Sequence, residues 1–231
     1  MNYSLAKHPG FTRSLPFGLF LFVLAIELSW TTLQPVFPGL DQIDKRVLYR
    51  IKSGLAAIAL VWLWPSYTEL RQTPRPLSNW VVAIVTGLGV FGLWINLTQS
   101  WALLNKMGMG FNPYQPDGQI NWWLTGIRLA GSALVVPIIE ELFWRSFIMR
   151  WVDKQDFLTL DPRDVGYRGL LVSSGLFALE HTQWVAGFLA GFAYGWLYRK
   201  TGNLWLSILA HAITNAALGA WVIYTGNWQF W

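Results

Sequence analysis

The side chains best suited to chemistry are two adjacent carboxylates, Glu140 and Glu141, followed by Arg145. On a helix, Glu141 and Arg145 lie one turn apart on the same face, where their charges neutralise each other. Adjacent helical residues point about 100° apart, so Glu140 faces a different neighbour and is left without an obvious partner. A poorly solvated carboxylate of this kind suits a general base. The alternative is a structural cluster in which both carboxylates share one arginine.

Two of the three histidines, His181 and His211, lie in apolar stretches further along the chain. His211 and Asn215 are four residues apart, so they present two hydrogen-bonding groups on one helix face. Taken singly, either histidine is more simply explained as a hydrogen-bonding partner between helices. Glu140, His181 and His211 could together hold zinc in a three-ligand site, although nothing in their spacing requires a metal.

Several classes of chemistry are excluded by the rest of the sequence. The chain of 231 residues has no cysteine, which excludes disulfides, thiol catalysis and thiolate metal sites. It contains no HExxH zincin helix, GxSxG elbow, P-loop or dinucleotide fingerprint. The formal net charge is +5, but the 17 Lys and Arg residues are dispersed rather than gathered in a patch, so nucleic acid is not an expected partner.

The composition places these residues in a lipid bilayer. Hydrophobic residues make up 54% of the chain and charged residues only 13%, too few to cover a water-facing surface. The 16 Trp residues are typical of membrane interfaces, where we expect them to act as anchors. We therefore predict an all-α fold, a polytopic transmembrane helical bundle of about seven or eight spans with a buried polar cavity.

Seven stretches are long enough to cross about 30 Å of hydrocarbon at about 1.5 Å per residue. The fourth is long for one span and contains Pro137, so we expect a kink there, or a break that would give an eighth span. We predict an N-terminal membrane region over residues 1–118 and a catalytic membrane region over 119–231. The predicted spans are residues 15–37, 53–67, 79–104, 119–151, 167–181, 183–198 and 203–224.

The orientation follows from the basic residues outside these spans. With seven spans, more of them fall on the N-terminal side than on the other, although the first loop argues the opposite way. The positive-inside rule thus predicts a multi-pass protein of the cell (inner) membrane with a cytoplasmic N-terminus. The ten residues on the N-terminal side are Lys7, Arg13, Arg71, Arg75, Arg150, Lys154, Arg163, Arg168, Arg199 and Lys200, and the five on the other are Lys45, Arg46, Arg50, Lys52 and Lys106.

The polar residues fall at similar depths. Glu140, His181 and His211 lie roughly 12–20 Å from the presumed cytoplasmic ends of their helices, at about 1.5 Å per residue. Three helices thus bring polar groups to one level, which favours a single buried cavity open to one side.

A stripe of small residues, Gly187, Gly191 and Gly195, lies on the sixth predicted helix. Such a series lets another backbone approach closely. It is compatible with tight packing within the bundle and also with a homodimer face.

Three ordered motifs resemble those of the CPBP family of intramembrane proteases, which comprises CAAX proteases and bacteriocin-processing enzymes. The resemblance covers about residues 129–220, and the first three spans resemble no family that we can name. The sequence of residues 140–147 and 194–205 is most similar to that of a bacterial subgroup, the exosortase-associated CAAX prenyl protease-related proteins. The motifs are Glu140-Glu141-x-x-x-Arg145, Phe177-x-x-x-His181 and His211-x-x-x-Asn215.

This resemblance implies a membrane endopeptidase that hydrolyses a peptide bond of a peptide or membrane protein within the bilayer. CAAX-type processing is one form of this activity. Carried over by position, Glu140 would activate a water molecule that His181 helps to hold. His211 and Asn215 would stabilise the oxyanion.

The same resemblance gives Glu141 and Arg145 supporting roles. Family members are commonly labelled metalloendopeptidases, but a metal-free glutamate mechanism is also proposed for them, and we expect no obligatory metal. If zinc were present, Glu140, His181 and His211 would hold it.

Two other classes of function remain open. One is a non-catalytic membrane partner, such as a maturation or immunity factor that has kept the fold. The other is a proton-coupled carrier that uses the same carboxylates and histidines, and the membrane charges Glu27 and Arg128 offer it some support.

Overall fold

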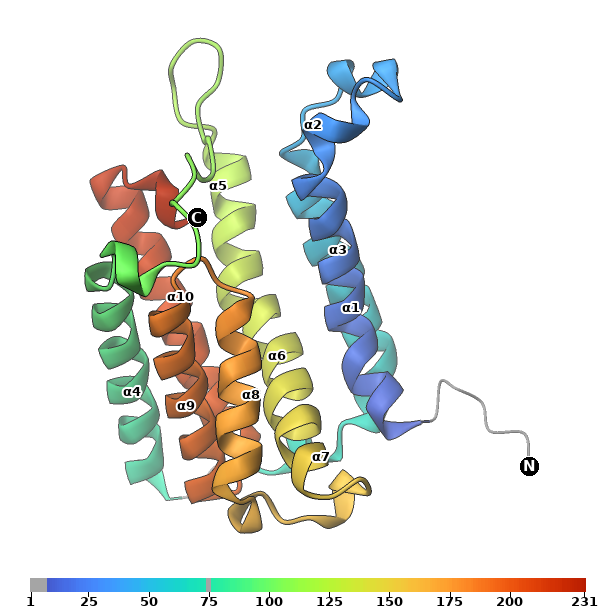
Figure 1. Ribbon diagram of the computed structural model, residues 1–231, viewed down its shortest axis with the longest axis vertical. Helices are drawn as coiled ribbons and strands as arrows, with labels where there is room; N and C mark the ends of the chain where they lie inside the picture. The colour runs from blue at the N-terminus through green and yellow to red at the C-terminus, as the bar shows by residue number, and fades with distance from the viewer. Residues whose placement is uncertain (1–7, 74–75) are drawn as a thin grey trace.

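The computed structural model describes residues 8–73 and 76–231. This part of the chain is helical, with one isolated bridge between Tyr114 and Ile120, so the predicted all-α fold is confirmed. Figure 1 shows the helices running up and down the bundle as parallel columns. The α-helices are α1 (Pro9–Leu28), α2 (Trp30–Leu33), α3 (Val47–Leu63), α4 (Leu77–Asn96), α5 (Trp122–Ala130), α6 (Val136–Glu141), α7 (Met149–Asp153), α8 (Tyr167–Leu179), α9 (Trp184–Thr201) and α10 (Leu204–Thr225).

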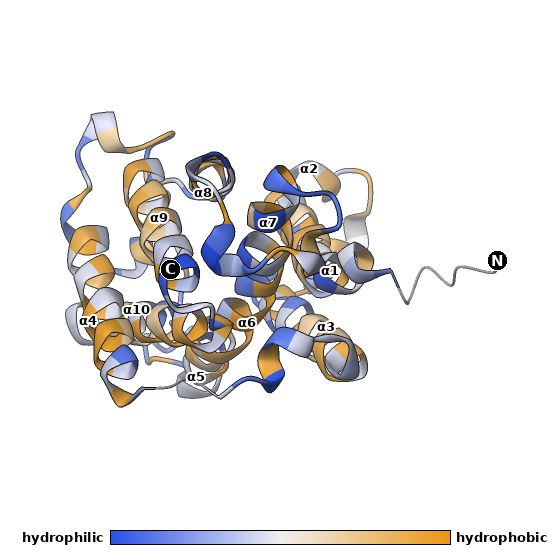
Figure 2. Ribbon diagram, turned by 90° about the horizontal axis from the view of Figure 1, so that it is seen from below, coloured by the Kyte–Doolittle hydropathy of each residue, from blue (hydrophilic) through white to orange (hydrophobic). Residues whose placement is uncertain are grey.

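Five helical segments of the described chain are long and apolar enough to cross a membrane. Their outward faces carry apolar side chains, as on α4, where Val81, Val85 and Leu88 are at least half exposed. Viewed along the helices, α3 and α4 lie at the edge of the bundle, and hydrophobic residues make up much of both (Figure 2). The chain is therefore an integral multi-pass membrane protein. The five segments are Pro9–Leu28, Val47–Ser66, Leu77–Asn96, Trp122–Asp153 and Leu204–Thr225.

The helices α8 and α9 correspond to the fifth and sixth spans that the sequence predicts. Neither is among the five long apolar segments, and α8 has only 13 residues, fewer than the 17 or so that a span needs. The turn between them, Glu180–Gln183, lies well below the upper end of α5 (Figure 1). His181 is thereby placed inside the bundle instead of at its end.

The helix that carries Glu140 is continuous from Trp122 to Asp153, so the possible break at Pro137 does not occur. Its 32 residues correspond to about 48 Å, longer than the hydrocarbon core. Two π-helical segments, η6 (Gly131–Val135) and η7 (Leu142–Ile148), interrupt the α-helical winding instead. Pro137 lies near the start of α6 directly after η6, where local re-winding accommodates its missing N–H.

Short polar residues and glycines set the ends of the helices that hold the site. The Asn121 side chain accepts a hydrogen bond from Leu124 N at the start of α5. Asn203 caps α10 in the same way. Gly202, with φ of 70°, ends α9 in the left-handed region that glycine adopts without strain.

The glycine stripe of α9 packs against α8. A Cβ atom at Gly191 would lie 3.0 Å from the Cα atom of Ser174, and one at Gly187 would lie 3.2 Å from Ala178 Cα. The two helix axes can approach closely because these side chains are absent. The stripe thus serves packing within the chain, and a homodimer remains a prediction.

A buried ion pair joins the first helix to the segment before α4. Arg13 Nη2 lies 2.6 Å from Glu69 Oε2, and both side chains are buried. The hydroxyl of Ser146, from η7, donates to the same carboxylate. Burial raises the pKa of the Glu69 carboxyl, but the hydrogen bonds and charge of Arg13, with the Ser146 hydroxyl, outweigh it and hold this pKa below its ordinary value.

The alternation of the helices groups the basic residues at two ends, as in the predicted topology, except that Lys7 and Arg75 lie outside the described residues. Which end faces the cytoplasm remains a prediction. The proposed boundary near residue 118 is also a prediction. α4, from the N-terminal side of that boundary, packs closely against α10.

Candidate active site

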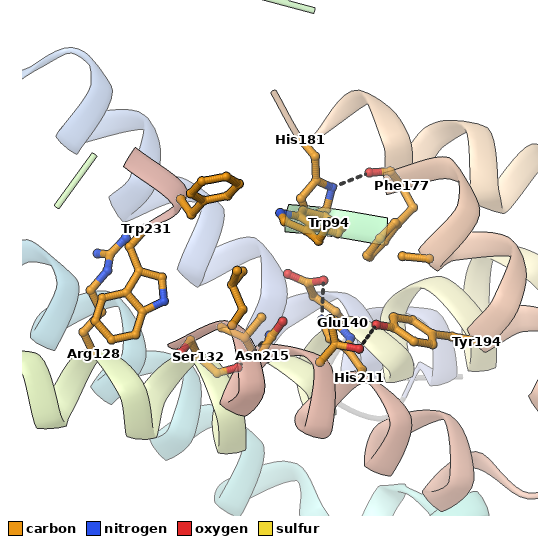
Figure 3. Close-up of a pocket in the computed structure, with 15 residues that line it drawn as sticks. Trp94, Arg128, Ser132, Glu140, Phe177, His181, Tyr194, His211, Asn215 and Trp231 are labelled. Atoms are coloured by element: carbon orange, nitrogen blue, oxygen red, sulfur yellow. Dashed lines mark hydrogen bonds and ion pairs between the residues drawn. The ribbon is translucent and has the colours of Figure 1, made fainter. Parts of the chain in front are cut away.

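A cavity of about 190 Å³ lies among the helices, and all four predicted catalytic residues line it. Glu140 comes from α6, His181 from the turn after α8, and His211 and Asn215 from α10. Figure 3 shows their side chains facing one another across this space. The structure therefore brings together residues that are 75 positions apart in sequence, from 140 to 215.

The carboxylate of Glu140 is buried, and one of its two oxygens has no hydrogen-bond partner among the described residues. Among the described residues, nothing donates a hydrogen bond to its Oε2 atom. The Nε2 atom of His211 lies 4.0 Å from this oxygen. A buried carboxylate in this state is costly unless a water molecule or a substrate group satisfies it.

His211 is held by a second carboxylate behind it. Its Nδ1 atom lies 2.9 Å from Glu141 Oε1, while Glu141 Oε2 lies 3.1 Å from Arg145 Nε. Arg145 is itself held by the carbonyl of Gly191 at 3.3 Å. This fixed chain of contacts orients the His211 ring so that Nε2 faces Glu140.

His181 is fixed in one tautomer by the backbone. Its Nδ1 atom lies 2.8 Å from the carbonyl oxygen of Phe177. A carbonyl can only accept, so Nδ1 carries the proton and a neutral ring leaves Nε2 as an acceptor. The rings of Trp94 and His181 are nearly perpendicular, with centroids 5.1 Å apart and the planes at 84°.

Asn215 is anchored through one of its two amide N–H groups. Its Nδ2 atom donates to the carbonyl of Ser132, in the π-helical segment η6, at 2.8 Å. The second N–H of this amide remains for a group in the cavity.

Tyr194 and Trp94 belong to the site although sequence reasoning did not select them. The ring of Tyr194 stacks on His211, with centroids 5.0 Å apart and the planes at 17°. Its hydroxyl donates to Thr214 Oγ1 at 2.7 Å. Tryptophans were expected as interface anchors, but Trp94 and Trp231 line the cavity instead. Nothing in the sequence distinguishes these aromatic residues from the other aromatic residues of the helices.

Other ionisable side chains of the helical bundle have different roles. Glu180 accepts a hydrogen bond from Trp144 Nε1 at 3.0 Å and does not line the cavity. Glu27 is paired with Lys52 at 2.6 Å. Arg128, in contrast, does line the cavity.

No group of three or more His, Asp or Glu side chains within residues 8–73 and 76–231 has a metal-binding arrangement. Glu140, His181 and His211 therefore share the cavity without forming the three-ligand set that zinc would need.

Comparison with known proteins places these residues in a family context. Residues 121–217 match the family described as "Type II CAAX prenyl endopeptidase Rce1-like". This segment begins at the cap of α5, and it contains Glu140, Glu141, Arg145, His181, His211 and Asn215. No curated protein and no solved structure matches the chain. In agreement with the motif resemblance, the chain carries over residues 121–217 a domain similar to the Rce1-like type II CAAX prenyl endopeptidases.

Proposed function

We propose that the protein is a glutamate-type intramembrane endopeptidase. The observation that carries this proposal is the buried carboxylate of Glu140, which lacks a hydrogen-bond partner on one oxygen and shares a cavity with His181, His211 and Asn215. Each of these three side chains keeps a hydrogen-bonding atom that its own anchoring contact does not use. Similarity to membrane peptidases over residues 121–217 supports the same activity.

In the proposed reaction, Glu140 takes a proton from a water molecule that His181 Nε2 also binds. The water oxygen attacks the carbonyl carbon of the scissile peptide bond, forming a tetrahedral intermediate. The C–N bond then breaks, and Glu140 returns the proton to the leaving amine. Base catalysis of this kind contributes about 10²- to 10⁴-fold to a rate.

The oxyanion would be stabilised by the free N–H of Asn215 and by His211. A neutral His211 that donates from Nδ1 to Glu141 has no proton on Nε2, so His211 can donate to the oxyanion only in its imidazolium form. Glu141, held by Arg145, then bears the matching negative charge behind the ring. Donors of this type are worth about 2.7–4 kcal/mol each in a hydrolase.

The substrate class is part of the proposal. CAAX processing would require a peptide whose last four residues are Cys, two aliphatic residues and a variable residue. The exosortase-associated subgroup and the inner-membrane location rest on the sequence motifs and the basic residues alone. Substrate peptides would reach the cavity from the bilayer, which the apolar outer surface of the bundle contacts.

The test uses the purified chain in lipid nanodiscs and a fluorogenic CAAX peptide, in farnesylated and unmodified forms. We expect Glu140→Gln to lower the cleavage rate by about 10²- to 10⁴-fold. Asp161→Asn is the control, because that carboxylate is paired with Arg163 and lies outside the cavity. Equal rates for wild type and Glu140→Gln would contradict the mechanism.

The alternatives give different outcomes. A proton-coupled carrier would show uptake into vesicles driven by a pH gradient and lost on Glu140→Gln. A non-catalytic partner would tolerate replacement of Glu140, His181, His211 and Asn215 one at a time. Cleavage that depends on Glu140, without such uptake, supports only the peptidase.

A further inference from the structure

Arg128 is a cation without an acidic partner at one end of the catalytic cavity. In the part of the chain that the structure describes, no carboxylate forms an ion pair with it, and its buried Nε atom has no hydrogen-bond partner. Three aromatic rings surround the guanidinium instead, those of Tyr49 at 4.6 Å, Phe111 at 4.9 Å and Trp231 at 5.7 Å. Such a cage holds the charge in place but does not neutralise it.

A second cavity, of about 900 Å³, meets the first at this residue, because Arg128 and Trp231 line both. The two acids that line the second cavity are already paired. Glu27 lies 2.6 Å from Lys52, and Asp44 lies 2.7 Å from Arg46. Each acid is thus engaged by another cation and neither forms an ion pair with Arg128, which leaves the guanidinium open to a bound anion.

The π-helical segment η6 brings Arg128 onto the same face as the catalytic glutamate. Twelve residues of α-helix turn through about 1200°, which would place Arg128 about 120° away from Glu140 around the axis. A π turn takes in one additional residue, so the stretch winds like about eleven residues and the offset falls to about 20°. Accordingly, Arg128, Ser132, Val136 and Glu140, spaced by four, all line the cavity.

Figure 3 shows the result of this alignment: Arg128 lies beside Trp231 at one end, with Ser132 and Asn215 between it and Glu140. The rise between the Cα atoms of Arg128 and Glu140 is about 16–18 Å. An extended peptide covers about 3.3–3.6 Å per residue, so about five extended residues span this rise.

We propose that Arg128 binds the free C-terminal carboxylate of the peptide substrate. This inference rests on the proposed peptidase function and adds a specificity-determining residue to it. A peptide substrate carries a carboxylate at its C-terminus, and the planar guanidinium of Arg128 matches the two oxygens of that group. A chain end held there directs cleavage at Glu140 to a bond near the C-terminus. The short product would leave through the wider second cavity.

The experiment measures binding and cleavage separately, in nanodiscs. Two fluorescent farnesylated CAAX peptides are compared, one ending in a carboxylate and one in a carboxamide. Binding is measured with the Glu140→Gln protein, which should hold the peptides without cutting them. We expect the acid to bind roughly 10- to 100-fold more tightly than the amide. Replacing Arg128 by Gln in the Glu140→Gln protein should make the affinities for the acid and the amide equal.

Arg199→Gln is the matched control. Arg199 also lies over an aromatic ring, that of Tyr167 at 4.5 Å, and its Nε atom also lacks a partner, yet it lines neither cavity. The control should keep the full ratio. Arg128→Lys preserves the charge but lacks the planar guanidinium, so it should keep part of the preference for the acid over the amide. This variant provides the test if Arg128→Gln does not fold.

Three results would overturn the inference: equal binding of acid and amide, an unchanged ratio in Arg128→Gln, or no saturable binding of either peptide. Failure of the proposed function has a different signature. In that case the wild-type protein would bind the acid selectively but would not cut it.

Discussion

Gly87 on α4 offers a sharp test of how the bundle holds the active site. A Cβ atom at this position would lie 2.4 Å from the carbonyl oxygen of Ala210 and 2.9 Å from Ile213 Cβ, both on α10. The first contact is with backbone, so no side-chain rotation can relieve it, and the two helices must separate. Gly87 also accepts a hydrogen bond from Thr214 Oγ1 at 2.8 Å.

The expected cost of Gly87→Ala follows from two opposing effects. Overpacking costs about 1–3 kcal/mol, and replacing glycine by alanine within a helix returns up to about 1 kcal/mol. A backbone clash places the first effect near its upper end, so we expect a net loss of about 1–2 kcal/mol. This corresponds to a fall in Tm of about 2–8 °C for a chain of this size.

Two glycines on the same helix are matched controls. Cβ atoms at Gly89 and Gly92 would meet nothing within 4 Å, so Gly89→Ala and Gly92→Ala should leave Tm unchanged or raise it by up to about 4 °C. The assay is thermal unfolding in detergent followed by tryptophan fluorescence. If Gly87→Ala is as stable as the two controls, the described approach of α4 to α10 is wrong.

Three further predictions concern the site and its supports. Glu141→Gln should lower kcat, with a smaller effect on KM, because His211 loses the anion behind its ring. Steady-state cleavage kinetics measure both constants, and an unchanged kcat would contradict the role of Glu141. Tyr194→Phe should keep most activity because the ring that stacks on His211 remains, whereas Tyr194→Leu should lose more, and equal activity of the two variants would refute the stacking argument. The Glu69 pKa lies below its ordinary value of 4.5 in the folded state, so its pair with Arg13 stabilises the protein above that value and the contribution is lost as the pH falls further. Tm measured from pH 7 to pH 3 should therefore fall less in Glu69→Gln, which already lacks the pair, than in wild type.

The placement of the candidate site residues in one cavity could be predicted in part from their spacing, whereas their roles rest on the motif resemblance. Glu141 and Arg145, four residues apart, form the expected pair at 3.1 Å. Glu140 and His211 meet at 4.0 Å because each lies near the middle of its helix. Helical rise alone was sufficient to place such groups at one level.

The contacts that orient these residues could not be predicted in the same way. The link between Glu141 and His211 joins residues 70 positions apart, and helix periodicity gives no information on which helices are neighbours. The contact of Trp94 with His181 likewise depends on how α4 docks. Periodicity assumes regular winding, so it also places Arg128 on the wrong face of its helix until the π turn η6 is known.

The glycines also show that spacing predicts only some of the contacts between helices. The stripe of α9 was recognised from its spacing, and it packs against α8. Gly87 has no such pattern to distinguish it from Gly89 and Gly92, yet it alone of the three touches α10. Spacing identifies a helix face, and only packing shows what lies against it.

The central claim, that Glu140 activates water and forms no covalent bond with the substrate, is tested most directly by a single turnover in ¹⁸O-labelled water with the protein in excess over the peptide. Mass spectrometry then follows the label in the product and in the protein. We predict one ¹⁸O atom in the new C-terminal carboxylate of the product and none in the protein fragment that contains Glu140. Label in the Glu140 carboxyl after the same turnover would show a covalent intermediate and would contradict the general-base mechanism.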